Sequence, residues 1–189
     1  MLGKIIAFEG VKGSGKSTLI DLFVQKFPTW KKVKEPQIFA KQITAETSDQ
    51  AAAMLFTIDR YNYYRSTVLP LLEQGHNVIY DRYKLSTMAY QRPAGVSWIR
   101  NVNKIVPDPA MFIFIHLYWT LAEKRVVSRD GIVDHDLMLK AYSGYNDAIW
   151  FNKKYFKIKE IDGSKPVEEV LEDIIKVLPI TIHLPSTYY

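Results

Sequence analysis

Cysteine is missing from the 189 residues of this chain. Without thiols the protein can form no disulfide bond, no thiolate-ligated zinc or iron–sulfur centre, and no cysteine nucleophile. Long hydrophobic runs are missing too, since the most apolar stretch, from Ala110 to Leu117, is short and contains His116. A membrane-spanning helix needs about 20 apolar residues. We therefore expect a cytoplasmic protein that has no contact with membranes.

A strong charge imbalance is also lacking. The 25 Lys and Arg residues and the 20 Asp and Glu residues give a net charge of +5, a mild excess that suits an anionic ligand. A nucleic-acid-associated ATPase would need a further basic stripe or motor motifs, and the sequence has neither, so we expect no stable nucleic-acid partner. Hydrophobic residues make up 48%, which excludes a disordered chain. With no repeat and no linker, residues 1–189 are predicted to form a single domain.

Short apolar runs alternate with amphipathic segments along the whole chain. The runs are rich in β-branched and aromatic residues, as buried strands are, and the segments between them have the length and period of helices. This alternation predicts an α/β fold, a five-stranded parallel sheet flanked by helices on both faces. Pro70 is expected to bend or break the longest helix. The predicted strands are Lys4–Phe8, Lys32–Glu35, Asn77–Tyr80, Met111–Leu117 and Lys157–Ile161, and the predicted helices are Lys16–Lys26, Gln50–Gln74, Leu85–Gln91, Thr120–Ser128, Asp136–Asn152 and Val167–Val177.

A glycine-rich segment follows the first predicted strand and opens the first predicted helix. It reads GVKGSGKS from Gly10 to Ser17 and fits the phosphate-binding loop pattern G-x-x-x-x-G-K-[ST]. In such a loop backbone N–H groups surround phosphate oxygens, Lys16 reaches the β- and γ-phosphates, and the Ser17 hydroxyl helps to hold Mg²⁺. The loop alone leaves GTPases, ATPases and kinases open. The residues predicted to bind the nucleotide are Gly10, Gly13, Ser14, Gly15, Lys16, Ser17 and Thr18.

Two further residue pairs indicate binding chemistry. Phe56 and Arg60 share a face of a predicted helix, where a ring can stack on a base and a guanidinium can donate to its carbonyl oxygen. A core phenylalanine beside a surface ion pair through Asp59 fits the same spacing. Asp81 and Arg82 follow the third strand, where the carboxylate can orient Mg²⁺ through water and the arginine can hold an acceptor phosphate. A salt bridge at the strand end is the alternative for this second pair.

The order of motifs along the chain resembles that of the thymidylate kinases. The resemblance covers nearly the whole sequence. It implies the P-loop NTPase fold of the nucleoside monophosphate kinases, transfer of the γ-phosphate of ATP to dTMP with Mg²⁺, a homodimer, and a place in nucleotide biosynthesis. The matching motifs are Phe8-Glu9-Gly10, the phosphate loop, Glu35-Pro36, LFTIDR from Leu55 to Arg60, Asp81-Arg82-Tyr83, STMAYQ from Ser86 to Gln91, Pro107-Asp108 and Ile161-Asp162-Gly163.

The resemblance also implies an acceptor site. It puts Thr87 and Gln91 near the base, and Tyr90 near the 2′ position of the sugar, where the tyrosine disfavours ribose. The expected metal ligands are Ser17 and Asp81. The residues expected to bind the substrate are Glu35, Pro36, Phe56, Arg60, Arg82, Ser86, Thr87, Tyr90 and Gln91.

A lid is expected at about residues 125–136, where the helix after the fourth strand ends. Mobile arginines complete many phosphoryl-transfer sites by closing over them, and Gly131 can act as the hinge. An ordinary basic helix end, stabilised by the helix dipole, is the alternative interpretation. The residues predicted to act in catalysis are Lys12, Lys16, Arg82, Arg125 and Arg129.

Three features depart from the thymidylate kinase pattern. Lys12 stands where those kinases carry an acidic residue near the 3′-hydroxyl of the acceptor. Because a lysine cannot accept a hydrogen bond, we expect it to supply positive charge to the transition state instead. Glu35-Pro36-Gln37 lacks the glycines that normally follow, and the lid is short and poor in arginine. Two alternatives therefore stay open, a kinase for another (deoxy)nucleoside monophosphate and a catalytically weak P-loop nucleotide-binding protein.

Overall fold

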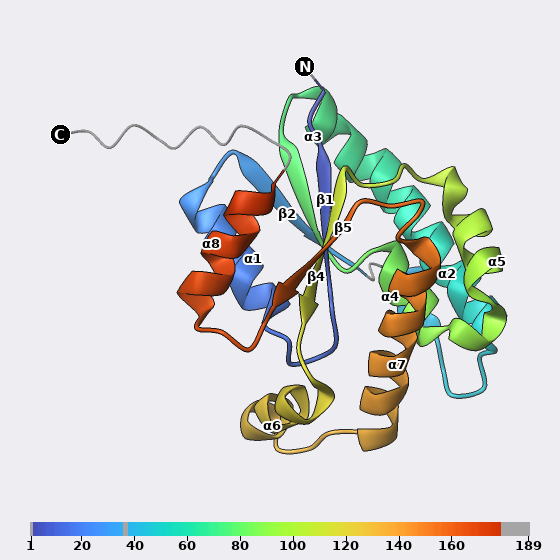
Figure 1. Cartoon of the computed structure of the whole chain (residues 1–189). Helices are drawn as coiled ribbons and strands as arrows, with labels where there is room; N and C mark the ends of the chain where they lie inside the picture. Colours follow the sequence, from blue (N-terminus) through green and yellow to red (C-terminus); the bar gives the residue numbers. More distant parts are fainter. Residues whose placement is uncertain (1, 36–37, 179–189) are drawn as a thin grey trace.

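A computed structural model describes residues 2–35 and 38–178 of the chain (Figure 1). Pro36, one of the residues expected to bind the substrate, lies outside these ranges. The strands are β1 (Ile5–Glu9), β2 (Trp30–Lys34), β3 (Asn77–Asp81), β4 (Met111–His116) and β5 (Ile158–Asp162). They form one parallel sheet in the order β2-β3-β1-β4-β5. The predicted five-stranded parallel sheet is confirmed.

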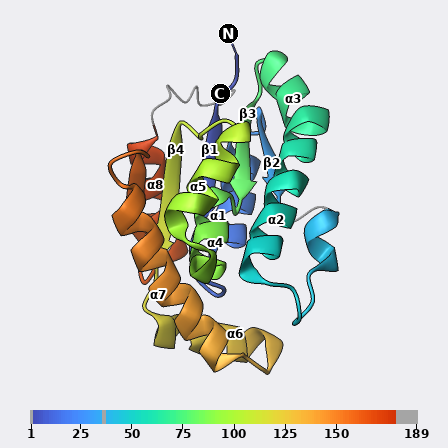
Figure 2. The same cartoon turned by 90° about the vertical axis from the view of Figure 1, so that its right-hand side faces the viewer.

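Helices cover both faces of this sheet. They are α1 (Lys16–Lys26), α2 (Asp49–Tyr63), α3 (Leu69–Glu73), α4 (Lys84–Tyr90), α5 (Val96–Val102), α6 (Trp119–Asp130), α7 (His135–Asn152) and α8 (Val167–Val177). Helices α1 and α8 lie on one face, and α2, α4, α5 and α7 lie on the other (Figures 1 and 2). In the described part of the chain no helix is long and apolar enough to cross a membrane.

The side chains of the central strands alternate between two apolar layers. On β1, Ile5 and Ala7 belong to the layer formed with α4 and α7, whereas Ile6 and Phe8 belong to the layer formed with α1 and α8. All residues of β1 are buried. Burial on both faces explains why these strands are continuous hydrophobic runs in the sequence rather than alternating ones.

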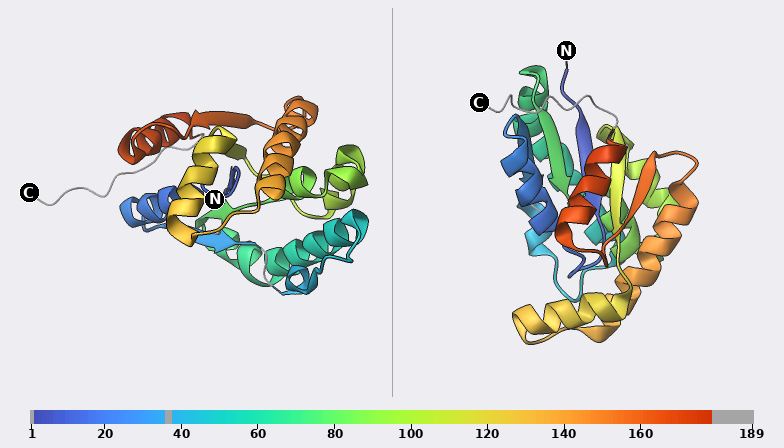
Figure 3. Two further views of the ribbon diagram at one scale, coloured as in Figure 1. Left: turned by 90° about the horizontal axis from the view of Figure 1, so that it is seen from below. Right: turned by 60° about the vertical axis from the view of Figure 1, so that its left-hand side comes forward.

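The strand order reverses at β1, which lies between β3 and β4. In sheets of this kind ligands bind outside the carboxyl ends of the strands at such a switch point. The segments that leave these ends are the phosphate loop after β1 and the turn into α4 after β3. Helix α6 extends across the same edge of the sheet, below it in Figure 1 and in front of it in the left view of Figure 3. The fold thus brings three functional segments to one edge.

The long helix predicted over Gln50–Gln74 is divided into two. α2 ends at Tyr63, a π-helical segment covers Tyr64–Val68, and α3 begins at Leu69. Pro70 stands in the first turn of α3, where its fixed φ and missing N–H group are tolerated. The backbone keeps right-handed helical angles at both ends of the π-helical segment, so the chain does not break at Pro70, and the irregularity that does occur precedes the proline.

The other predicted strands and helices end within two residues of the expected positions, and one α-helix was not predicted. β2 begins at Trp30 and ends at Lys34, so it starts two residues before the predicted strand, and Glu35 follows it. Sequence periodicity does not predict α5 at all, because a helix of 7 residues makes only about two turns and gives no clear period.

Helices α4 and α7 pack unusually closely. A Cβ atom at position 144 would lie 2.1 Å from the carbonyl oxygen of Ala89, so only glycine fits there. Gly144 thereby lets the backbone of α7 rest on α4. The next residue, Tyr145, is fully buried at this contact.

Candidate active site

The phosphate loop connects β1 to α1 as predicted. Gly13 has a φ of +84°, and a Cβ atom there would lie 2.4 Å from the carbonyl oxygen of Ala122 on α6. Glycine is therefore required both by the turn of the loop and by the approach of α6. The loop ends at the N-terminus of α1, whose free N–H groups and positive dipole end favour anions.

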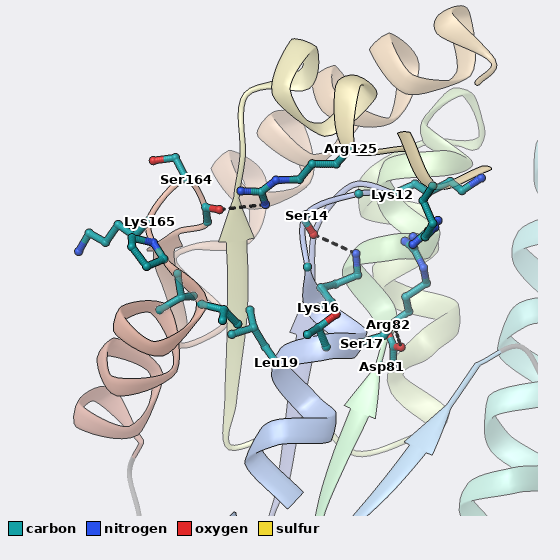
Figure 4. A pocket seen from close by; sticks show the side chains of 18 of the residues that line it. Lys12, Ser14, Lys16, Ser17, Leu19, Asp81, Arg82, Arg125, Ser164 and Lys165 are labelled. Atoms are coloured by element: carbon teal, nitrogen blue, oxygen red, sulfur yellow. Dashed lines mark hydrogen bonds between the residues drawn. The ribbon is translucent and has the colours of Figure 1, made fainter. Parts of the chain in front are cut away.

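Lys16 is folded back onto this loop. Its Nζ donates to the carbonyl oxygens of Gly10 at 2.7 Å and Val11 at 2.8 Å. It also donates to Ser14 Oγ at 3.1 Å, the bond drawn in Figure 4. Burial lowers the pKa of Lys16 well below its usual value, and the positive charge of Arg82 adds to the decrease. An anion in the loop favours the charged form of Lys16, so the loop and the lysine are suited to bind phosphate together.

Ser17 and Asp81 meet beside the loop. Ser17 Oγ donates to Asp81 Oδ2 at 2.7 Å, so Asp81 bonds to Ser17 rather than to Arg82. Hydroxyl and carboxylate oxygens are ligands that Mg²⁺ accepts. Within the described ranges no group of three or more His, Asp or Glu side chains is placed to hold a metal ion. The pair therefore fits Mg²⁺ held mainly by phosphate oxygens and water, the usual arrangement in nucleotide sites.

A cleft of about 910 Å³ opens above the loop. Figure 4 shows Lys16, Ser17, Asp81 and Arg82 gathered at one side of it and Lys165 at the opposite end. Among the charged side chains of the lining seven are basic and one is acidic, which suits a polyphosphate. The lining residues are Lys12, Gly13, Ser14, Gly15, Lys16, Ser17, Thr18, Leu19, Lys34, Asp81, Arg82, Arg125, Arg129, Gly163, Ser164, Lys165, Pro166, Val167 and Val170.

A second, smaller pocket of about 290 Å³ lies between α2 and α4. Phe56 and Arg60 both line it, which confirms that they share a face of the helix. The side-chain oxygen of Gln91 is buried and has no hydrogen-bond partner among the described residues. The complete lining is Glu35, Phe56, Arg60, Arg82, Tyr83, Ser86, Thr87, Tyr90 and Gln91.

Arg60 does not form a surface ion pair with Asp59, which was the alternative interpretation of the Phe56 and Arg60 spacing. It is 1% exposed, and it binds Glu35 through Nε at 2.7 Å and through Nη2 at 2.5 Å. Nη2 also donates to Thr87 Oγ1 at 3.1 Å, and Nη1 donates to Asn103. Burial raises the pKa of Glu35 to about 7, although Arg60 opposes this. With four of its five N–H groups engaged by described residues, Arg60 keeps one for a ligand.

Asp59, the partner in that alternative, has a different role. Its Oδ1 accepts hydrogen bonds from the backbone N–H groups of Ile38 at 2.8 Å and Phe39 at 3.2 Å. Asp59 is 3% exposed, so this carboxylate fastens the segment after β2 to α2. The acidic residue of the LFTIDR motif thus holds the backbone of this segment.

Arg82 stands between the two cavities. It has a φ of +73°, and no other described non-glycine residue has a positive φ. This backbone conformation costs about 1–3 kcal/mol and persists only where neighbouring groups hold it. Its guanidinium lies over the ring of Tyr90, 5.4 Å from the centroid. Of the described lining residues, Arg82 alone belongs to both the cleft and the second pocket.

The turn that contains Arg82 is held by Glu9, the last residue of β1. The Glu9 carboxylate is fully buried, and its Oε1 accepts from the backbone N–H groups of Tyr83 at 2.9 Å and Ser86 at 3.1 Å. Its Oε2 accepts from Ser86 Oγ at 2.5 Å and Tyr145 Oη at 3.0 Å. No side chain at the N-cap position of α4 bonds to the helix. Glu9 therefore supplies the cap from a different element.

The predicted lid residues lie at the end of α6 and face the cleft. Arg125 Nη1 donates to the carbonyl oxygen of Gly163 at 3.1 Å. Lys12 of the phosphate loop and Arg129 both pair with Asp130, at 2.8 Å and 2.6 Å, and together they lower the pKa of that carboxyl group. Gly131 follows the last residue of α6 and caps the helix with a φ of +77°. A contact through Asp130 thus joins the loop to the segment predicted to be a lid.

Nearly every residue predicted for the site lines one of the two cavities. Gly10 contributes a carbonyl oxygen below the loop instead, and Pro36 lies outside the described residues. Sequence reasoning missed Lys34, Asn103 and Tyr145, for which no pattern gives a signal. The position of Glu9 directly before the phosphate loop did indicate that it lies near the site. That position alone did not indicate what the Glu9 side chain does there.

Comparison with known proteins agrees with this geometry. The thymidylate kinase family model matches residues 8–174. A probable thymidylate kinase from Pyrobaculum aerophilum is 31% identical over 185 residues, covering 92% of this chain and 95% of that protein. The probable thymidylate kinase of Archaeoglobus fulgidus is 31% identical over 192 residues, with 95% and 97% covered. The thymidylate kinase of Caldicellulosiruptor saccharolyticus is 30% identical over 203 residues, with 94% and 97% covered. Since the match extends over most of its length, this chain belongs to the thymidylate kinase family.

Proposed function

We propose that this chain transfers the γ-phosphate of ATP to dTMP and releases ADP and dTDP. The observation that carries this proposal is the position of Arg82, which lines both the phosphate-loop cleft and the smaller pocket. A donor phosphate and an acceptor phosphate on either side of one guanidinium would lie within reach of each other. Phosphoryl transfer depends mainly on such alignment and on neutralisation of charge.

We assign the cleft to ATP. Lys16 and the backbone N–H groups of the loop suit the β- and γ-phosphates, and the size and basic lining of the cleft suit the whole nucleotide. Ser17 and Asp81 are the ligands proposed for Mg²⁺, which when bound supplies positive charge to the phosphate oxygens. The proposed nucleotide-binding residues are Gly10, Gly13, Ser14, Gly15, Lys16, Ser17 and Thr18.

We assign the smaller pocket to dTMP. Phe56 can stack on the thymine ring, and the remaining N–H group of Arg60 can donate to a ring carbonyl. The unpartnered oxygen of Gln91 can accept from the ring N–H of thymine, which would satisfy a buried polar atom. Tyr90 is the residue proposed to face the sugar, and Arg82 is the residue proposed to hold the phosphate. Glu35, Ser86 and Thr87 complete the proposed substrate site.

In the transfer step an oxygen of the dTMP phosphate forms a bond to the γ-phosphorus. The bond from that phosphorus to the bridging β–γ oxygen breaks, and ADP leaves with the electron pair. Lys16 and Arg82 provide fixed positive charge for the phosphoryl oxygens. Closure of a lid at about residues 125–136 would add Arg125 and Arg129, and Lys12 would contribute charge from the loop. Their present contacts to Gly163 and Asp130 would be exchanged for contacts to phosphate.

We further infer that residues 1–189 act as one domain, that the enzyme works in cytoplasmic nucleotide biosynthesis, and that it forms a homodimer. The dimer is supported by an apolar row on α2. Met54, Ile58 and Tyr61 are spaced by four and three residues and therefore share a face, and they are exposed by 51%, 43% and 39%. An apolar row on the surface suits a symmetric interface.

The activity can be tested with a coupled assay of ADP release across the common nucleoside and deoxynucleoside monophosphates. We expect the highest kcat/KM with dTMP. Lys16→Ala should lower kcat by about 10²–10³-fold while the circular dichroism spectrum stays unchanged, because it removes a cation from the transferring phosphate. If another monophosphate gives a higher kcat/KM, that monophosphate and not dTMP is the acceptor. If no monophosphate increases ADP release, the chain is the catalytically weak nucleotide-binding protein of the alternative interpretation.

The base site can be tested with Phe56→Ala. Loss of stacking should weaken dTMP binding by about 1–3 kcal/mol, measured by titration calorimetry, while the affinity for ATP stays the same. Phe151→Ala is the matched control, since Phe151 is an exposed phenylalanine on α7 and lines neither cavity. A loss of ATP affinity with unchanged dTMP affinity would mean that the two cavities are assigned the wrong way round.

The dimer can be tested with Ile58→Glu. Sedimentation at micromolar concentration should give twice the monomer mass for the natural protein and the monomer mass for the variant, because a charge in an apolar interface is unfavourable. Ile105→Glu, which changes an exposed isoleucine that does not belong to the apolar row on α2, should remain dimeric. A monomer mass for the natural protein would contradict the proposal.

A further inference from the structure

Arg82 is oriented by uncharged oxygen atoms. Its Nη1 lies 3.2 Å from Tyr145 Oη, and 3.4 Å from both Ser86 Oγ and the carbonyl oxygen of Gly10. Within residues 2–35 and 38–178 it forms no ion pair with a carboxylate. Neutral acceptors direct a guanidinium without neutralising its charge, so Arg82 keeps its positive charge for an anionic ligand. The shortest of the three contacts is the one to Tyr145.

The Tyr145 hydroxyl is suited to accept that hydrogen bond. A phenol has one proton to donate, and Tyr145 Oη lies 2.6 Å from Ser86 Oγ and 3.0 Å from Glu9 Oε2; because the Ser86 proton goes to Glu9, the phenol proton is directed to this Ser86–Glu9 pair. Because the buried carboxylate attracts the proton, the lone pairs of the hydroxyl oxygen are left for Arg82. Glu9 thus sets the direction of the hydroxyl, and the hydroxyl sets the direction of the arginine.

The position of the Tyr145 ring is fixed as well. It packs against Phe114 of β4, with 5.2 Å between the ring centroids, and edge-on against Tyr90, at 6.1 Å. The neighbouring Gly144 holds the backbone of α7 against Ala89 of α4. The hydroxyl that contacts Arg82 is therefore held in place by the close packing of α7 on α4. Helix α7 is the helix that follows the proposed lid.

We propose that Tyr145 is a positioning residue for the acceptor phosphate, acting through Arg82. Its hydroxyl, directed by Glu9, holds the guanidinium at the junction of the two cavities. This inference rests on the role proposed above for Arg82, but it names a residue that lines neither cavity. Tyr145 would accordingly affect recognition of the phosphate group and not recognition of the base.

The test is the affinity of Tyr145→Phe for dTMP and for thymidine, measured by titration calorimetry. The variant keeps the ring and loses only the hydroxyl, and Glu9 keeps its bonds to Tyr83 and Ser86, so we expect a folded protein. Affinity for dTMP should fall by about 3- to 10-fold, the size of one net hydrogen bond. Affinity for thymidine, which has no phosphate, should stay the same. Equal losses for the two ligands would overturn the proposal in favour of a general structural role.

Two further variants complete the experiment. Tyr80→Phe is the matched control, because this tyrosine is also fully buried and its hydroxyl has no partner in the described chain, and dTMP affinity should not change. In an Arg82→Ala background, Tyr145→Phe should have no additional effect on dTMP affinity, since the residue through which it acts is gone. The same loss in both backgrounds would overturn the proposal.

The outcomes also separate this inference from the assignment of Arg82. If Arg82→Ala weakens dTMP binding and Tyr145→Phe does not, the positioning role is wrong and the role of Arg82 stands. If Arg82→Ala leaves dTMP binding unchanged, the role of Arg82 is wrong and the role of Tyr145 is wrong with it.

Discussion

The arrangement of the site depends on one buried carboxylate, that of Glu9. It lies at the carboxyl end of β1, immediately before the phosphate loop, and it accepts hydrogen bonds from two backbone N–H groups and two hydroxyls. A carboxylate removed from water is unfavourable unless its oxygens are satisfied, and here four donors meet them. Because the donors come from the turn before α4, from α4 itself and from α7, Glu9 ties the loop that would bind one nucleotide to the turn that would bind the other.

This constraint explains why Arg82 can keep a strained backbone. Its N–H group bonds to the carbonyl oxygen of Phe8, and the next N–H group, of Tyr83, bonds to Glu9. The turn is therefore fixed at both ends by β1, and the guanidinium is directed to the junction of the cavities. The contact between Lys12 and Asp130 is different, since Lys12 is half exposed and the pair is accessible to water. Such a pair is weak and easily exchanged, which the closure proposed for residues 125–136 would require.

The sequence was most informative where one short segment determines both structure and chemistry. The phosphate loop, α1 and the shared face of Phe56 and Arg60 are local patterns, and all three are found as predicted. Contacts between distant segments could not be derived in this way. The bond of Arg60 to Glu35, the cap that Glu9 provides for α4 and the reach of Tyr145 to Arg82 all join residues far apart in the chain. These contacts depend on strand order and helix packing, which a single sequence does not define when it is read without an alignment of its relatives.

The central claim is that the charge and oxygens of Glu9 hold the Arg82 turn, and the most direct measurement is native-state amide hydrogen exchange of Glu9→Gln. The amide keeps the size of the side chain and can keep one oxygen toward these two N–H groups, but it carries no charge, so both bonds lose the strength that an ionised acceptor gives them. We predict faster exchange at the N–H groups of Tyr83 and Ser86 and weaker binding of dTMP, with unchanged exchange in β3. Unchanged exchange at both N–H groups, together with unchanged dTMP affinity, would contradict the account.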